Sequence, residues 1–323
     1  MLRVCKTVLQ QRVAMFRSRG GLAPLHAFRT AGLVPRAETE QETSPGVREH
    51  VFKPSENEPP VSHPAAVRFG ETGERRAVSR PGMLLVGHGS RDLLGQQAFL
   101  DLAAHVADRL PETAVAAGFL ELCPPTLADA WQSLRDQGVQ EVRAVPAILF
   151  AAGHAKQDIP EALEAAAGCP VRLAAHLGLH PAVVERSKQI SDRLLASCQP
   201  LPAARQGLLL VGRGSSDPAA TAEMLAFQQQ RAQSDRFAVQ SLAFVAKAQP
   251  CVAEQLERLG QLELERIVVQ PHLLFGGRVY DEVAEQVVQA SFRFSHQHWL
   301  LTPPLGPDPL LVEAIVDRFT QVV

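Results

Sequence analysis

Two nearly identical stretches decide the fold of this chain: Met83-Leu-Leu-Val-Gly-His-Gly-Ser-Arg-Asp92 and Leu208-Leu-Leu-Val-Gly-Arg-Gly-Ser-Ser-Asp217. They lie 125 positions apart. The same offset relates further pairs, namely Phe119 and Phe244, Pro125 and Pro250, Pro146 and Pro271, and Phe150 and Phe275. A repeat this regular indicates that one structural unit is present twice.

Each copy alternates short apolar runs with amphipathic segments. The expected strands of the first copy are Leu84–Val86, Ala114–Leu120, Val142–Phe150 and Val171–Ala174, and its expected helices are 95–110, Pro125–Gly138, Pro160–Ala167 and Pro181–Ala196. The second copy repeats the order with Leu208–Val211, Leu225–Gln233, Val239–Val245, Val252–Leu259, Ile267–Phe275, Val283–Ala290, Trp299–Thr302 and Leu310–Val322. Strands alternating with helices predict parallel sheets covered on both faces. We therefore expect an α/β protein of two similar half-domains with flavodoxin-like layers.

The repeat divides the chain into an extension (1–82), a first half (83–198), a linker (199–207) and a second half (208–323). Residues 1–37 hold seven basic residues and no acid, which fits an organelle presequence, a disordered tail, or translation from a misplaced start. Residues 38–82 are rich in Pro, Glu and Ser, a composition typical of disorder. We expect a cytoplasmic protein, or one of an organelle matrix if the presequence is real.

Bulk composition excludes several classes of protein. The net charge of −2 gives no bias towards nucleic acid or membrane surfaces. The five cysteines form no C-x-x-C pair, so a zinc ribbon, an iron–sulfur motif or a disulfide framework is not expected. No apolar run reaches the roughly 20 residues of a membrane helix. Because the second half already supplies a pseudo-partner, we expect a monomer.

Three polar residues of the first half follow strands at the edge where α/β sheets bind ligands. His88 lies between two glycines directly after the first strand, Glu121 follows the second strand, and His154 follows the third. Neutral imidazoles bind metals and accept protons near neutral pH. Each residue also has an ordinary interpretation, as a solvated turn histidine or an exposed loop carboxylate. Their joint replacement by Arg213, Ala246 and Val279 in the second half favours a functional role and predicts one active and one inactive half.

Several neighbouring residues receive secondary roles. Asp158 either orients His154 or, as we prefer, favours the start of a helix through the helix dipole. We expect Cys123 to be a small buried apolar residue. The cations Arg213, Lys247, His272 and Arg278 of the second half either bind the carboxylates of a ligand or are ordinary surface charges. The remaining histidines show no convergent setting and are expected to be structural or solvated: His105, His176, His180, His296 and His298.

The three motifs of the first half resemble those of the sirohydrochlorin chelatases of the CbiX type, which are class II tetrapyrrole metal chelatases. The motifs are Gly87-His-Gly-Ser-Arg91, Gly118-Phe-Leu-Glu-Leu-Cys-Pro-Pro-Thr126 and Val145-Pro-Ala-Ile-Leu-Phe-Ala-Ala-Gly-His-Ala-Lys-Gln-Asp-Ile-Pro160. The resemblance is strong over about 83–196 and weaker over 207–322. It implies a duplicated chelatase-like fold, with His88 and His154 as metal-handling residues and Glu121 as the active-site acid.

The resemblance also implies an activity: insertion of cobalt or ferrous iron into sirohydrochlorin, on the way to cobalamin or siroheme. No cofactor beyond the substrate metal and no ATP is then expected. The tetrapyrrole bears many carboxylates, so Arg91, Lys156, Arg213 and Lys247 are candidate substrate-binding residues. A non-enzymatic metal or tetrapyrrole carrier would use the same histidines. A histidine phosphatase is disfavoured because Gly87 stands where that family has an arginine before the histidine.

Overall fold

The computed structural model describes residues 81–150, 153–166, 170–233 and 236–322, without the side chains of 153–156 and 165–166. The predicted extension, apart from Pro81 and Gly82, therefore lies outside the described residues. The side chains of His154 and Lys156 lie outside them as well. Within the described part, no helix combines the length and the hydrophobicity that crossing a bilayer requires.

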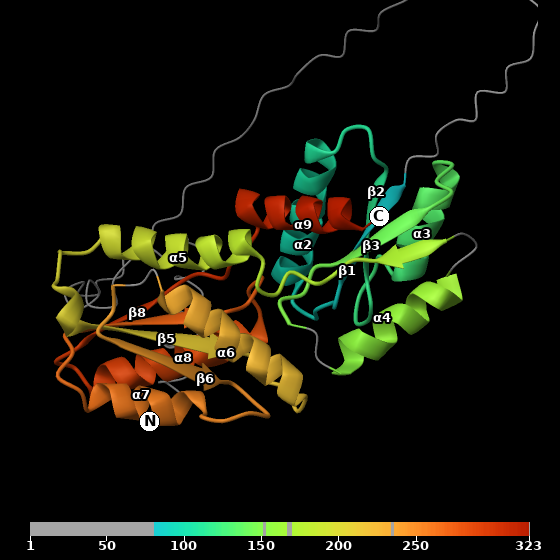
Figure 1. Ribbon diagram of the computed structural model, residues 1–323. Helices are drawn as coiled ribbons and strands as arrows, with labels where there is room; N and C mark the ends of the chain where they lie inside the picture. The colour runs from blue at the N-terminus through green and yellow to red at the C-terminus, as the bar shows by residue number, and fades with distance from the viewer. Residues whose placement is uncertain (1–80, 151–152, 167–169, 234–235, 323) are drawn as a thin grey trace, which may run out of the picture. The chain divides into compact units, whose positions relative to one another are not determined.

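Two four-stranded sheets form the framework, and every strand pair in them is parallel (Figure 1). The first sheet has the order β2-β1-β3-β4 and the second β6-β5-β7-β8. Their strands are β1 (Gly82–Gly87), β2 (Val115–Phe119), β3 (Val142–Pro146), β4 (Val171–Leu173), β5 (Gln206–Gly212), β6 (Val239–Phe244), β7 (Arg266–Pro271) and β8 (His298–Leu301). The predicted α/β fold and its duplication are confirmed.

Helices connect the parallel strands, as they must when successive strands run in the same direction. They are α2 (Leu93–Arg109), α3 (Leu127–Asp136), α4 (Gly153–Ala166), α5 (Pro181–Ala196), α6 (Pro218–Ala232), α7 (Val252–Gly260), α8 (Arg278–Arg293) and α9 (Pro309–Gln321), with the short 3₁₀ helix η2 (Ala203–Arg205) ahead of β5. In each half the first of these helices begins at an aspartate, Asp92 or Asp217, whose side chain accepts a hydrogen bond from the backbone two residues on. This aspartate satisfies a backbone N–H group that the helix itself leaves unpaired.

Alternation along the central strands sorts their side chains into separate cores. In β1, Met83 and Leu85 face one core, while Leu84 and Val86 face another. The first of these cores is shared, because it also contains Leu208 and other residues of the second half. The two remaining cores lie on the opposite faces, one in each half. A continuous apolar interior therefore joins the halves.

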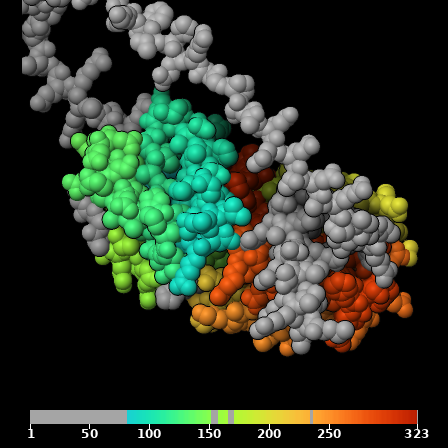
Figure 2. Space-filling model, turned by 180° about the vertical axis from the view of Figure 1, so that it is seen from behind, coloured from blue at the N-terminus to red at the C-terminus, as the bar shows by residue number. Residues whose placement is uncertain are grey.

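The two helices that end the halves are exchanged. The last helix of the first half, α5, packs against α6, and the backbone carbonyl of its Ser187 accepts a hydrogen bond of 2.7 Å from the Gln270 side chain of β7. The last helix of the second half, α9, packs against α2 and β3. In Figure 2 the dark red of α9 accordingly lies beside the cyan and teal of the first half. The sequence pattern predicted both helices but not this exchange.

Buried polar contacts fix the exchanged helices. Arg186 of α5 donates to the carbonyl of Leu305 at 2.7 Å and pairs with Asp308 at 2.9 Å, and both charged side chains are about nine-tenths buried. Asp308 also caps α9 by accepting from Leu310. Arg231 of α6 is fully buried and donates to the hydroxyl of Ser191 on α5. Removing either arginine would leave buried polar groups unpaired, so these contacts hold the helices in place.

Boundaries differ from the sequence expectation where strands lose their partners. β3 and β7 end at Pro146 and Pro271, rather than at Phe150 and Phe275, because their ladders with β1 and β5 stop there. The four residues that follow are loop. α4 starts at Gly153, earlier than expected, with Pro160 inside it.

His272, which directly follows β7, is not the surface cation that we expected. Its side chain is buried between the rings of Phe227, 4.0 Å away, and Phe150, 5.3 Å away. Neither ring nitrogen has a hydrogen-bond partner among the described residues. Burial therefore disfavours the charged form and lowers the pKa of His272 to about 3. Both interpretations that the sequence left open for His272, a carboxylate-binding cation and an ordinary surface charge, were therefore wrong, because this side chain is buried against the shared core.

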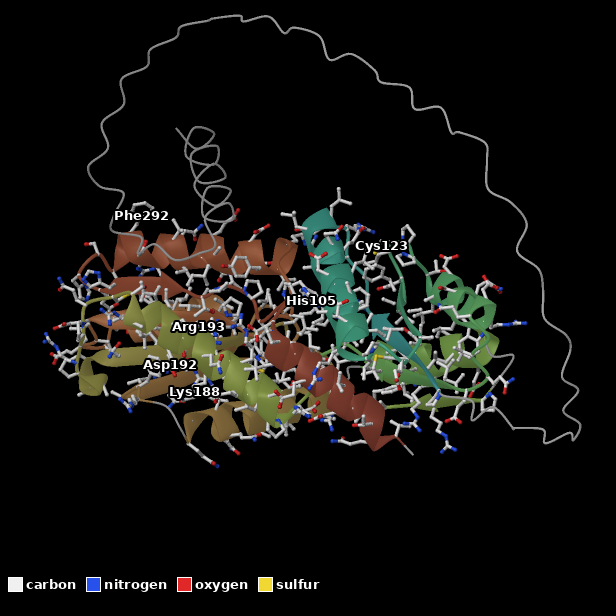
Figure 3. All side chains as sticks on the ribbon, turned by 90° about the horizontal axis from the view of Figure 1, so that it is seen from above. His105, Cys123, Lys188, Asp192, Arg193 and Phe292 are labelled. Carbon is white, nitrogen blue, oxygen red and sulfur yellow. The ribbon has the colours of Figure 1, made fainter. Side chains whose placement is uncertain are left out.

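We expect Arg186→Ala to lower the free energy of unfolding by about 3–5 kcal/mol, since it strands the buried Asp308 carboxylate. Lys188→Ala is the matched control on the same helix: Figure 3 shows Lys188 with Asp192 on the outer side of α5, and such exposed pairs contribute about 0–1 kcal/mol. Urea unfolding, followed by the fluorescence of Trp131 and Trp299, one in each half, measures both. Equal unfolding midpoints for the two variants would contradict the role of the exchanged contact.

The depressed pKa of His272 makes stability depend on pH. The unfolded chain protonates this imidazole below about pH 6.5, whereas the folded protein does so only near pH 3, so acid favours unfolding between these values. We expect a loss of about 1.4 kcal/mol per pH unit in this window that is absent in His272→Phe. Urea titrations at pH 7, 6 and 5 measure the difference; parallel curves for the two proteins would refute it.

Candidate metal-handling site

His88 lies in the turn that follows β1, which is an inner strand of the first sheet, between β2 and β3. Gly87 and Gly89 on either side are needed for packing. A Cβ at Gly87 would lie 2.9 Å from the ring of Phe99. Gly89 has a φ of 103°, and a Cβ there would collide with the carbonyl oxygen of Glu121. The Gly-His-Gly motif therefore brings the chain segment of His88 against that of Glu121.

Backbone hydrogen bonds extend the β1–β2 pairing past the strands and align the two side chains. Leu120 donates to the carbonyl of Gly87 at 2.8 Å, and Glu121 donates to that of His88 at 3.2 Å. The His88 Nε2 atom lies 3.4 Å from Glu121 Oε1. The side chains are 36% and 55% exposed, so solvent and a ligand reach both. His88 and Glu121 thus lie at the same edge of the sheet, and their chemical roles stay a prediction.

His154 belongs to the first turn of α4, but its side chain lies outside the described residues. Its segment leaves β3, which is the neighbour of β1 on the side opposite β2. The chain passes from β1 to β2 on one side and from β3 to β4 on the other, so it leaves these two adjacent strands in opposite directions. In α/β folds the crevice at such a point is the usual ligand site. That the imidazoles of His88 and His154 face each other stays a prediction.

Asp158 does not start a helix. It is the sixth residue of α4, and the first turn of that helix contains no acid. The preferred dipole role was therefore wrong, because the helix begins before Pro160 rather than near it.

The remaining candidate residues differ in their exposure to solvent. Arg91 and Arg278 are exposed. Cys123 packs against the shared core but is only partly buried, rather than buried as expected. Figure 3 shows His105 on α2, where it is exposed. The remaining histidines are accounted for as follows: His176 pairs with Glu223 at 2.6 Å, His180 caps α5, and His296 and His298 are exposed.

The second half has a shallow groove of about 400 Å³ at the equivalent edge, and Lys247 is the one charged residue among its lining. The other lining residues are Ser215, Ser216, Pro218, Thr221, Ala222, Leu225, Ala248 and Gln249. Arg213 and Lys247 are both exposed. Sequence analysis identified the two cations but not the hydroxyls beside Lys247, although Ser215 repeats Ser90 of the first half.

Metal ligands are sparse in the described part of the chain. It contains no group of three or more His, Cys, Asp or Glu side chains arranged to hold a metal ion. His88 and Glu121 form a pair that is open on the solvent side. Such a pair suits a metal ion that is handed on rather than one that is held as a structural ion, since structural sites enclose the metal with four ligands.

Comparison with known proteins finds relatives over most of the chain. The chain is 28% identical over 249 residues to a sirohydrochlorin cobaltochelatase of Priestia megaterium, covering 73% of this chain and 78% of that protein. It is 29% identical over 224 residues to a sirohydrochlorin ferrochelatase of the same organism, covering 69% and 84%. The structure of SirB from Bacillus subtilis with Fe³⁺ superposes with a TM-score of 0.67 at 24% identity, covering 75% of this chain and 95% of that one, which shows a shared fold.

The CbiX family model matches the chain twice, over residues 82–193 and 207–322. These matches coincide with the two sheets and their helices. Together they cover most of the chain, and the resemblance that the strand-end motifs suggested is confirmed: the chain belongs to the CbiX family.

Proposed function

We propose that this protein inserts a divalent metal ion, cobalt or ferrous iron, into sirohydrochlorin. The observation that carries the proposal is the contact between His88 and Glu121 at the ligand-binding edge of the first sheet, beside the strand that leads to His154. The relatives named above are a cobaltochelatase and a ferrochelatase, which supports the reaction but leaves the metal open. Imidazole accepts cobalt and iron alike.

The residues suit the chemical demands of insertion. Two pyrrole N–H protons must leave the macrocycle, and the metal must exchange water for pyrrole nitrogens. His88 and His154, as neutral imidazoles, hold the metal and accept protons. Glu121 touches the His88 ring and is more than half exposed, so it passes protons from that ring to solvent. The absence of histidines and acid at the equivalent positions of the second half restricts this chemistry to the first half.

Cations of both halves complete the site in this proposal. Arg91 and Lys156 in the first half, with Arg213 and Lys247 in the second, bind the carboxylates of the substrate. The hydroxyls beside Lys247 add neutral hydrogen-bond donors for the same groups. The proposed reaction has two substrates, the tetrapyrrole and the metal ion, and includes no nucleotide.

We expect His88→Ala and His154→Ala each to abolish insertion, because each removes a metal-handling imidazole. Glu121→Gln removes only the proton relay and is expected to slow insertion by about 10²-fold or less. His105→Ala, on the exposed side of α2, is the control and keeps the wild-type rate. Anaerobic incubation with sirohydrochlorin and cobalt(II) or iron(II), followed by visible absorption, measures all four. Wild-type rates in either histidine variant would remove the mechanism, and stoichiometric metal binding without turnover by the wild type would indicate a carrier.

Arg213→Ala and Lys247→Ala are expected to raise the KM for sirohydrochlorin several-fold and to leave kcat nearly unchanged, because they remove charge pairing outside the reacting centre. Arg193→Ala is the control, since Arg193 lies on the exposed side of α5 (Figure 3). Steady-state kinetics at low ionic strength, where charge pairing is least screened, measures the effect. An unchanged KM in both variants would exclude the second-half cations from substrate binding.

A further inference from the structure

The loop that follows β7 in the second half contacts the first half beside both of its site segments. This loop comprises residues 272–277, and we call it the buttress loop. It begins with the buried His272 and ends at Gly277, the residue before α8. Its equivalent in the first half, 147–152, leads to His154.

One end of the buttress loop supports the approach to α4. The ring of His272 lies 5.3 Å from that of Phe150, at an interplanar angle of 34°. Phe150 also meets Phe227 of α6 edge-on at 6.3 Å, so it packs against two neighbouring aromatic rings of the second half. Phe150 precedes the start of α4 by three residues, so this packing fixes the end of the described segment that leads towards that helix.

The other end supports the turn of His88. Phe275, the sequence equivalent of Phe150, meets Phe99 of α2 edge-on at 6.4 Å. Phe99 is the ring that packs against Gly87, directly before His88. The carbonyl oxygen of Gly276 lies against Gly95, and Gly277 lies against Asp92, the residue that caps α2. The two equivalent phenylalanines thus each cross to the opposite half.

We infer that the buttress loop positions the two strand-end segments of the first half, the one that contains Phe150 and the one that contains His88, and that His272 is its principal positioning residue at Phe150. The inference rests on the proposed function for the identity of the chemistry, but its contacts are independent of it. It gives the second half a role beyond substrate binding: the half without the site histidines supports the segments from which the site of the other half is built. Insertion depends on the position of these segments, because displacing a reacting group by about 1 Å costs roughly 10²-fold in rate.

A purely structural role does not explain why this buried position holds a histidine. Its two ring nitrogens are buried without a partner in the described residues, so an aliphatic side chain would suit the core better. The equivalent position in the first half is Ala147, which is likewise buried. Of these two equivalent positions, only the one that contacts Phe150 holds a planar ring.

The test compares His272→Ala, which removes the stacking ring, with His272→Phe, which keeps a ring of similar shape. Leu264→Ala is the matched control, because Leu264 is buried in the core on the far face of the second sheet. We expect His272→Ala to lower kcat roughly 10- to 100-fold with little change in the KM for sirohydrochlorin, His272→Phe to restore it, and Leu264→Ala to change neither. Phe150→Ala is expected to reproduce the loss, and the double variant to add little to either single one.

Two measurements without the tetrapyrrole separate this inference from the proposed function. Cobalt(II) titration followed by visible absorption is expected to show a weakened and altered spectrum in His272→Ala and in Phe150→Ala, but not in His272→Phe or Leu264→Ala. Hydrogen exchange is expected to be faster in the peptide covering the start of α4 in the same two variants. Wild-type exchange and cobalt spectra in both His272→Ala and Phe150→Ala would overturn the inference, as would equal losses in His272→Phe or Leu264→Ala. If the wild type binds cobalt but fails to insert it, the proposed function falls, and hydrogen exchange alone still decides the positioning role.

Discussion

Apolar packing between the two halves is the interaction on which the remaining structure depends. One face of each sheet contributes to the same core, and α5 and α9 pack across it on the sheet of the opposite half. Arg186 and Arg231 then fix these helices through buried polar contacts. Without this core neither sheet would be covered on both faces, and parallel sheets are stable only when they are. The site edge therefore exists because both halves are present.

Local sequence was sufficient to predict the elements and the edge at which the site residues gather. The repeated Gly-x-Gly-Ser-x-Asp motif contains the residues for a tight turn and for a helix cap, so the position of His88 followed from neighbouring residues alone. That Glu121 lies at the same edge also followed, because the carboxyl ends of parallel strands gather at one edge of a sheet, whereas its contact with the His88 ring became evident only from the structure. These constraints are short-range, because the residues that impose them are close in sequence to the residues that they position.

Long-range packing could not be predicted in the same way. Amphipathicity shows that α5 and α9 bury one face, but it does not show which sheet they cover. The burial of His272 was missed for the same reason, since a polar residue at a strand end is exposed unless the other half covers it. The early start of α4 was missed because Pro160 was taken as a boundary, although a helix that begins seven residues earlier includes it. Each of these outcomes depends on residues far away in the sequence or on the backbone of a whole segment.

The exchange of terminal helices has a consequence for how the two copies are free to diverge. If one copy existed alone, it would need a second identical molecule to donate the missing helix, and every amino-acid change would then occur on both sides of the interface at once. Joining the copies in one polypeptide removes that symmetry. One copy is then able to keep the site imidazoles while the other copy, which has lost them, has cations near the equivalent positions and a buried aromatic contact. In a symmetric pair of identical chains, each of these features would be present in both copies.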